Sequence, residues 1–254
     1  MQDPYAVDAA YYDLIHEDVD DDIGLWLSFA GRTTLPFLEI GAGSGRISVA
    51  LAQAGHAVTA LDPSPSMLTL AKSRADAAGV PLELVHATLH TARLESGRFG
   101  VVLFPADVFL YAADAGEQAL LLAAAATVVH FSGLVILDLP GPALGLDPSS
   151  NGDLLLAWSG ETADGDELEV WHVHEDNLAD QTRTLRVRYE RTAPDGALFR
   201  ETTIHSLRYV HPQECRHLLE RAGLQVTDVF GDYELGPLTN DSARMIVCAR
   251  RIAG

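Results

Sequence analysis

Lysine is nearly missing from this chain of 254 residues, since Lys72 is the only one. Lys and Arg together number 17 against 36 Asp and Glu, and the formal net charge is −19. Proteins that bind RNA or DNA draw much of their affinity from Lys and Arg, so we expect no nucleic-acid partner. A surplus of acid usually serves solubility, although its field would also favour a cationic ligand.

Cysteine is also scarce, because Cys215 and Cys248 are too few for a disulfide framework. No basic segment followed by an apolar core opens the chain, so we expect a cytoplasmic location. The run 119–137 approaches the length of a membrane span, but His130, Ser132 and Gly133 interrupt it. We therefore predict a buried helix, a turn and a buried strand there, and no membrane partner.

Two common phosphate-binding patterns are absent from the chain. No Gly-Lys-Ser or Gly-Lys-Thr occurs, which excludes the P-loop. Gly41, Gly43 and Gly45 follow an apolar run and precede a helical pattern, so they predict a strand, a ligand-binding turn and a helix. The dinucleotide fingerprint would place a further glycine at Arg46. A nucleoside ligand without a pyrophosphate is the better interpretation.

The second predicted strand, 57–61, leads directly into Asp62, and an acid in that place can accept hydrogen bonds from ribose hydroxyls. Ser64 and Pro65 then provide a helix N-cap and a first helical residue.

The segments 39–45 (Glu-Ile-Gly-Ala-Gly-Ser-Gly) and 61–68 (Leu-Asp-Pro-Ser-Pro-Ser-Met-Leu) resemble the first two motifs of the class I S-adenosylmethionine (SAM) dependent methyltransferases. The resemblance covers most of the chain. It implies SAM as the cofactor, a small-molecule methyl acceptor, direct transfer to nitrogen or oxygen, and no metal. The order of elements is similar to that of amino-acid and amino-sugar N-methyltransferases, which carry a β insertion after the fifth strand.

The remaining pattern predicts an α/β fold, a doubly wound, Rossmann-like sheet of seven strands with an N-terminal helical lid and an antiparallel β insertion after strand 5. Period-two alternation over 154–209 indicates the insertion. We expect a lid at 1–34, a SAM-binding domain at 35–145 and 211–254, and an insertion at 146–210 that covers the active site. The expected strands are 35–40, 57–61, 82–86, 99–104, 133–139, 224–230 and 243–250, and the expected helices are 44–54, 65–78, 114–130 and 212–222.

The resemblance also implies a set of site residues. Asp107, after the fourth strand, would hold an ammonium acceptor or accept its proton, unless it only caps the next element. Tyr12 would act beside it from the lid, where Tyr12-Asp13-Leu14 is similar to a closing segment of relatives. Asp138 and Arg208 would bind substrate. The expected cofactor-binding residues are Tyr11, Glu39, Gly41, Ala42, Gly43, Asp62, Pro63, Met67, Thr88, Leu89 and Pro105.

Several alternatives stay open at this point. Thr88 stands where relatives usually have an acid that bonds the adenine amino group, and a hydroxyl bonds it more weakly. Together with the unusual Asp107, it leaves room for a SAM-binding sensor or partner subunit without catalysis. A nicotinamide dehydrogenase ranks third. His172 and His174 lie two apart on one strand, but we expect no metal there. The insertion would also suit a homodimer contact.

Overall fold

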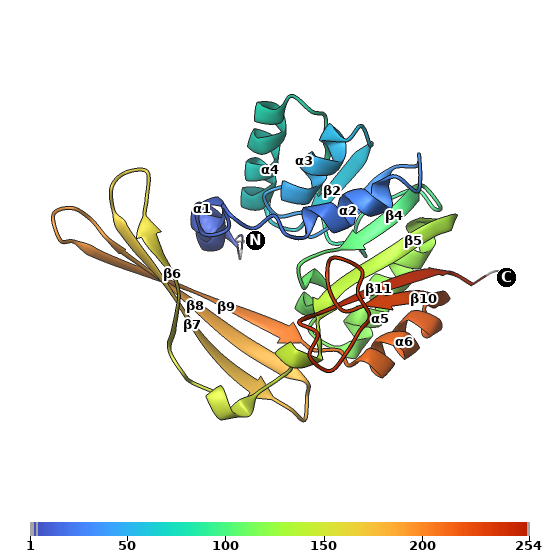
Figure 1. Cartoon of the computed structure of the whole chain (residues 1–254). Coiled ribbons are helices and arrows are strands. Elements are labelled where there is room, and N and C mark those ends of the chain that lie inside the picture. Colours follow the sequence, from blue (N-terminus) through green and yellow to red (C-terminus); the bar gives the residue numbers. More distant parts are fainter. Residues whose placement is uncertain (1–2, 4, 253–254) are drawn as a thin grey trace.

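The structure is a computed structural model that describes residues 3 and 5–252, and its centre is a seven-stranded sheet (Figure 1). The strand order is β10-β11-β5-β4-β1-β2-β3. Strands β1 to β5 run parallel, and β11 is antiparallel to both β5 and β10. This arrangement confirms the predicted Rossmann-like sheet. The strands are β1 (Phe37–Ile40), β2 (Val58–Asp62), β3 (Glu83–His86), β4 (Phe99–Phe104), β5 (Val129–Pro140), β10 (Leu224–Phe230) and β11 (Arg244–Arg251).

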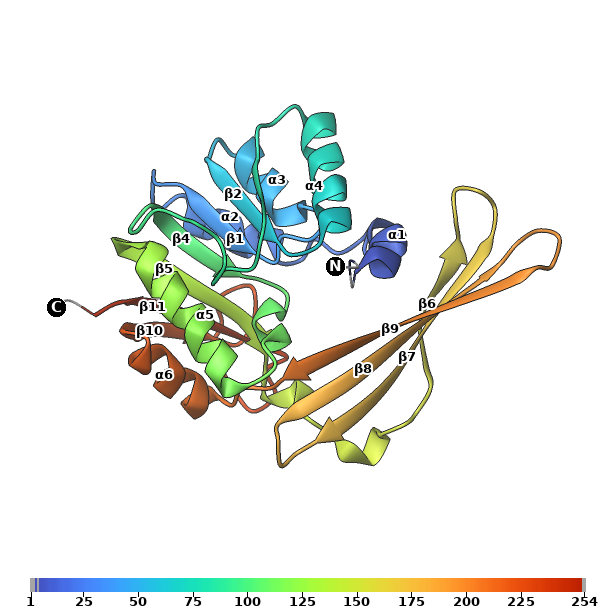
Figure 2. The same cartoon turned by 180° about the vertical axis from the view of Figure 1, so that it is seen from behind.

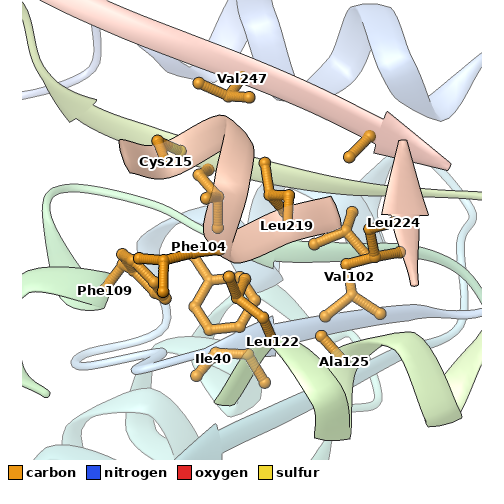
Figure 3. Close-up of a cluster of buried hydrophobic side chains, with 14 of the residues drawn as sticks. Ile40, Val102, Phe104, Phe109, Leu122, Ala125, Cys215, Leu219, Leu224 and Val247 are labelled. Atoms are coloured by element: carbon orange, nitrogen blue, oxygen red, sulfur yellow. The ribbon is translucent and has the colours of Figure 1, made fainter. Parts of the chain in front are cut away.

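Helices cover both faces of this sheet, as a doubly wound fold requires (Figure 2). One face packs against α2 (Ile23–Ala30) and α3 (Arg46–Gln53). The opposite face packs against α5 (Ala115–Val128) and α6 (Pro212–Arg221). Figure 3 shows this second layer, in which Leu122 from α5 and Cys215 and Leu219 from α6 meet Phe104 of β4.

Local sequence signals set the helix boundaries. Helix α4 (Pro65–Ala78) begins where Ser64 Oγ accepts from the Met67 N–H at 3.1 Å, and Gly79 ends it with φ +67°. Helix α5 begins at an Asp114 cap that accepts from the Glu117 N–H. Its end differs from the prediction, because β5 follows α5 directly with no turn at His130. The extra residues form a bulge, since Phe99 pairs with Val129 and Val101 already with Leu134.

The insertion is an antiparallel sheet of four strands between β5 and α6, as predicted. Its strands are β6 (Leu155–Glu161), β7 (Glu167–Asn177), β8 (Thr182–Thr192) and β9 (Leu198–Arg208). The sheet extends away from the larger one, and α1 (Ala6–Ile15) lies between the two (Figures 1 and 2). Apolar side chains of α1 pack on Leu168, Val170 and Val187 of the insertion.

Only one of the two N-terminal helices lies between the sheets. Helix α2 buries Leu25, Trp26 and Phe29 in the core under the main sheet, so this part of the expected lid at 1–34 belongs to the core instead. The reason is its composition, because α2 has apolar residues over most of its surface and cannot stay exposed.

In the part of the chain that is described, every helix is too short or too polar to cross a membrane.

Candidate functional site

The glycine turn after β1 lies at the carboxyl edge of the main sheet, and neighbouring elements pack closely on it. A Cβ on Gly41 would collide with Val108, which belongs to the short helix η1 (Val108–Tyr111). A Cβ on Gly45 would lie 2.9 Å from the Ala71 Cβ of α4. Both glycines also have positive φ, at +66° and +79°. Only glycine therefore lets η1 and α4 approach this turn.

Asp62 joins the turn after β1 to the turn after β2 at this edge of the sheet. Its Oδ2 accepts from the Gly43 N–H at 2.9 Å, and its Oδ1 accepts from the Ser64 N–H at 2.8 Å. Burial raises the pKa of this carboxyl group, although the two backbone donors oppose that rise. Each carboxylate oxygen keeps a further lone pair, so Asp62 can also accept from ribose hydroxyls.

Glu39 lies behind the turn and not on its open side. The side chain is buried and accepts a hydrogen bond from Ser48 Oγ of α3. Burial raises the pKa of Glu39 to about 8. We therefore revise the expected cofactor contact, because Glu39 holds β1 to α3 from within the core.

The other expected cofactor residues divide by exposure. Thr88 is half-buried after β3, with its Oγ1 2.8 Å from Thr91 Oγ1, and Pro63 is exposed after β2. Leu89, Met67, Ala42 and Pro105 are buried. The structure thus brings polar and apolar groups together along the ends of β1 to β4.

The two lid tyrosines point to different partners. The Tyr12 hydroxyl lies 3.9 Å from the position of a Cβ on Gly43, and its ring stacks on His16. Burial raises the pKa of the Tyr12 phenol. Tyr11 instead stacks on Tyr189 of β8, with ring centroids 5.2 Å apart. The expectation that Tyr11 contacts the cofactor is revised, because that residue packs against the insertion.

Two acids attach the N-terminal segment to α4. Asp3 Oδ2 accepts from Ser64 Oγ at 2.9 Å and from the Ser66 N–H at 3.0 Å. Asp13 pairs with Arg74 of α4 at 2.7 Å. Sequence reasoning missed Asp3, whose only signal is an acid shortly before a predicted helix.

Asp107 and Asp138 share one arginine that sequence reasoning missed. Arg244 Nη2 donates to Asp107 Oδ1 at 2.8 Å, and Arg244 Nε donates to Asp138 Oδ1 at 2.8 Å. Asp107 has φ +63° and a side chain that is 35% exposed. The backbone of Asp107 is therefore left-handed just after β4, and its carboxylate is held by the guanidinium of Arg244.

Asp138 is fully buried at the end of β5, so we revise the expected substrate contact. Its Oδ2 accepts from the Ala106 N–H at 3.0 Å and from the Tyr233 hydroxyl at 3.3 Å. Burial raises the pKa of Asp138 to about 6, although Arg244 opposes the rise. Asp138 positions the Asp107 loop through Ala106 and Arg244.

Arg208 is likewise satisfied inside the protein. Its guanidinium donates to Gln118 Oε1 and to Glu214 Oε1, both at 2.6 Å, and so joins α5 to α6. The expected pairing with a substrate carboxylate is therefore revised.

Among residues 3 and 5–252, no group of three or more His, Cys, Asp or Glu side chains is placed to hold a metal ion.

Known proteins resemble the chain in sequence and in fold. Residues 37–133 match the profile of a methyltransferase domain. A cypemycin N-terminal methyltransferase from Streptomyces is 29% identical over 99% of this chain and 100% of its own length.

Two solved structures share the fold over nearly the whole chain. An S-adenosylmethionine-dependent methyltransferase from Clostridium acetobutylicum has a TM-score of 0.79 at 15% identity and covers 98% of each chain. A sugar N-methyltransferase from Streptoalloteichus has a TM-score of 0.75 at 16% identity, over 95% of this chain and 93% of its own.

The arginine between the two acids generates a stability prediction. Arg244→Gln should lower the free energy of unfolding by about 3 kcal/mol, because it leaves Asp138 buried without its cation. The matched control is Arg250→Gln, an exposed arginine of the same strand, which should change stability by less than about 0.5 kcal/mol. Urea unfolding at pH 8 measures both. Equal stability of the two variants would show that Arg244 does not compensate Asp138.

Proposed function

We propose that the chain acts as a class I S-adenosylmethionine-dependent methyltransferase and methylates an amine nitrogen of a small molecule. One observation carries the proposal. Helix α1 places Tyr12 over the Gly43 turn while its neighbouring face contacts the insertion, so a single helix borders both the cofactor edge and the second sheet. An acceptor between these elements would be shielded from bulk water.

The residues at the sheet edge fit SAM by their chemistry. We assign the ribose hydroxyls to Asp62, which has free lone pairs beside the glycine turn. We assign the adenine amino group to Thr88 and the methionine carboxylate to the Tyr12 hydroxyl. Apolar contacts would come from Ala42, Pro63, Met67, Leu89 and Pro105, with Gly41 and Gly43 giving room for the ligand.

The cofactor supplies a methyl group on a positively charged sulfur. When bound, SAM would give this methyl group to the acceptor nitrogen, with the C–N bond replacing the S–C bond and the electron pair of the broken bond staying on sulfur. We propose that Asp107 orients the nitrogen through an N–H bond, with Arg244 fixing the direction of the carboxylate. The proton that the amine loses passes to the Asp107 carboxylate, which is partly exposed and releases it to water once the product has left.

Two considerations support nitrogen over oxygen as the acceptor. The similar proteins named above are an N-terminal methyltransferase and a sugar N-methyltransferase. The acidic balance of the chain, with a formal net charge of −19, also attracts a cationic amine.

The proposal includes a cytoplasmic homodimer. Cys215 and Cys248 are buried and free, which suits a reducing compartment. The face of the insertion turned away from α1 exposes apolar side chains, among them Ile204 (61%), Leu156 and Leu198. A second copy of the chain would cover them.

Removal of the Asp62 carboxylate tests the cofactor assignment. Asp62→Ala should weaken SAM binding by tenfold or more, because the ribose loses charge-assisted hydrogen bonds of about 1.5–3 kcal/mol. Calorimetric titration with SAM, its demethylated product and NAD measures this. The control Asp76→Ala, an exposed acid of α4, should bind as the wild type does. Wild-type binding of NAD instead of SAM would overturn the assignment.

Removal of the Asp107 carboxylate tests the chemistry. Asp107→Ala should reduce kcat about 100-fold while SAM affinity stays within twofold, because Asp107 acts on the acceptor and not on the cofactor. The assay is release of the demethylated cofactor in a screen of aminosugars and peptide amines. Asp153→Ala, which removes an exposed acid of the insertion, should keep full activity. Tight SAM binding with no turnover on any acceptor would favour a sensor.

A further inference from the structure

Helix α1 buries a carboxylate against the insertion. The Asp8 side chain is only 10% exposed. Its Oδ1 accepts from the Tyr189 hydroxyl at 2.8 Å and from Thr203 Oγ1 at 2.9 Å, and His205 Nε2 lies 3.2 Å away. The partners come from adjacent strands, because Tyr189 is in β8 and the other two lie two apart on one face of β9. The Asp8 cluster, Asp8 with these three residues, thus joins α1 to the insertion.

The second oxygen of this carboxylate has no hydrogen-bond partner. Asp8 Oδ2 is buried, and no donor among the described residues reaches it. Burial raises the pKa of Asp8, but bonds from His205 and Tyr189 more than offset it, so the pKa lies below its usual value. A buried, ionised acceptor without a donor is unfavourable, and an N–H donor that carries positive charge would compensate it best.

Aromatic rings stand beside the Asp8 cluster. The Tyr5 ring stacks on His205 with centroids 5.7 Å apart, and Tyr111 meets both rings at their edges, 6.1 Å from Tyr5 and 5.9 Å from His205. Tyr111 is 40% exposed, so it is the ring of the three that faces solvent most. Burial, with the charges of nearby acids that include Asp8, raises the pKa of Tyr5 to about 12. Neutral aromatic rings around a carboxylate are typical of sites for organic cations.

The cluster borders the place where methyl transfer would occur. Asp8 lies four residues before Tyr12 on α1, which is about 6 Å along the helix axis. The Tyr12 hydroxyl is the group over the Gly43 turn. Tyr111 ends the short helix that follows Asp107, and the charges of Asp8 and Asp107 both act on its phenol. Tyr111 thus connects the cluster with the Asp107 loop.

We propose that Asp8, with the rings of Tyr5, Tyr111 and His205, is a binding subsite that recognises the acceptor as an organic ammonium ion, which gives up one proton to Asp107 before its nitrogen attacks. This inference rests on the proposed function and names its substrate class. An alcohol or a carboxylic acid of the same shape would leave the Asp8 charge without a counterion. The subsite therefore selects amines, independently of the cofactor residues.

The test uses cyclohexylammonium as the probe and cyclohexanol as its uncharged match. Each is titrated into the full chain, with and without the demethylated cofactor, while the imidazole NMR signals of His205 are followed. We expect the ammonium to shift these signals and to bind at least tenfold more tightly than the alcohol. Asp8→Asn, which keeps the shape of the side chain, should remove that preference. Equal binding of both probes, or an unchanged preference in Asp8→Asn, would overturn the proposal.

A further variant separates the charge of Asp8 from general charge attraction. Glu17→Gln removes one negative charge from an exposed side chain two residues after α1, outside the Asp8 cluster and outside the contacts that hold the helix, and should retain the preference for the ammonium probe. Loss of the preference in Glu17→Gln would show that general charge attraction and not the cluster binds the probe. Failure of the wild type to bind the demethylated cofactor would count against the proposed function alone.

Discussion

The attachment of α1 on two sides is the constraint on which the rest of the site depends. Asp13 ties the helix to Arg74 of α4, and Asp8 ties it to Thr203 and Tyr189 of the insertion. Between these contacts Tyr12 lies over the glycine turn. The short helix η1 also touches both sides, through Val108 at the Gly41 turn and Tyr111 at His205 of the insertion. Helix α1, with η1 beside it, therefore couples the place of the cofactor to the place of the acceptor.

A second constraint acts from the opposite side of the edge. Arg244 of β11 links Asp107, which follows β4, to Asp138, which ends β5. Buried Asp138 holds Arg244 in place, and Arg244 in turn orients the partly exposed Asp107. The loop after β4 is left-handed at Ala106 and Asp107, and backbone of that kind persists only where its surroundings hold it.

The elements and the cofactor turn were predictable because their signals are local. The segment 39–45 and the acid at Asp62 are contiguous patterns, and the caps at Ser64 and Asp114 lie within a few residues of the helices they begin. Alternation revealed the four strands of the insertion for the same reason. Contacts between distant residues gave no such signal. Arg244 meets Asp138 across 106 residues, and Asp8 meets His205 across 197. Tyr11 and Tyr12 are neighbours on α1 and point to different sides of the helix. The sequence could not show which of the two faces the glycine turn, because that depends on how α1 packs against the insertion.

Hydrogen exchange of the α1 amides, with and without the demethylated cofactor, tests the central claim that this helix joins the two halves of the site. Our account predicts that cofactor binding slows exchange in α1 and also in β9, which α1 contacts through Thr203 and His205. Protection confined to the glycine turn and α4, with α1 and β9 unchanged, would contradict it.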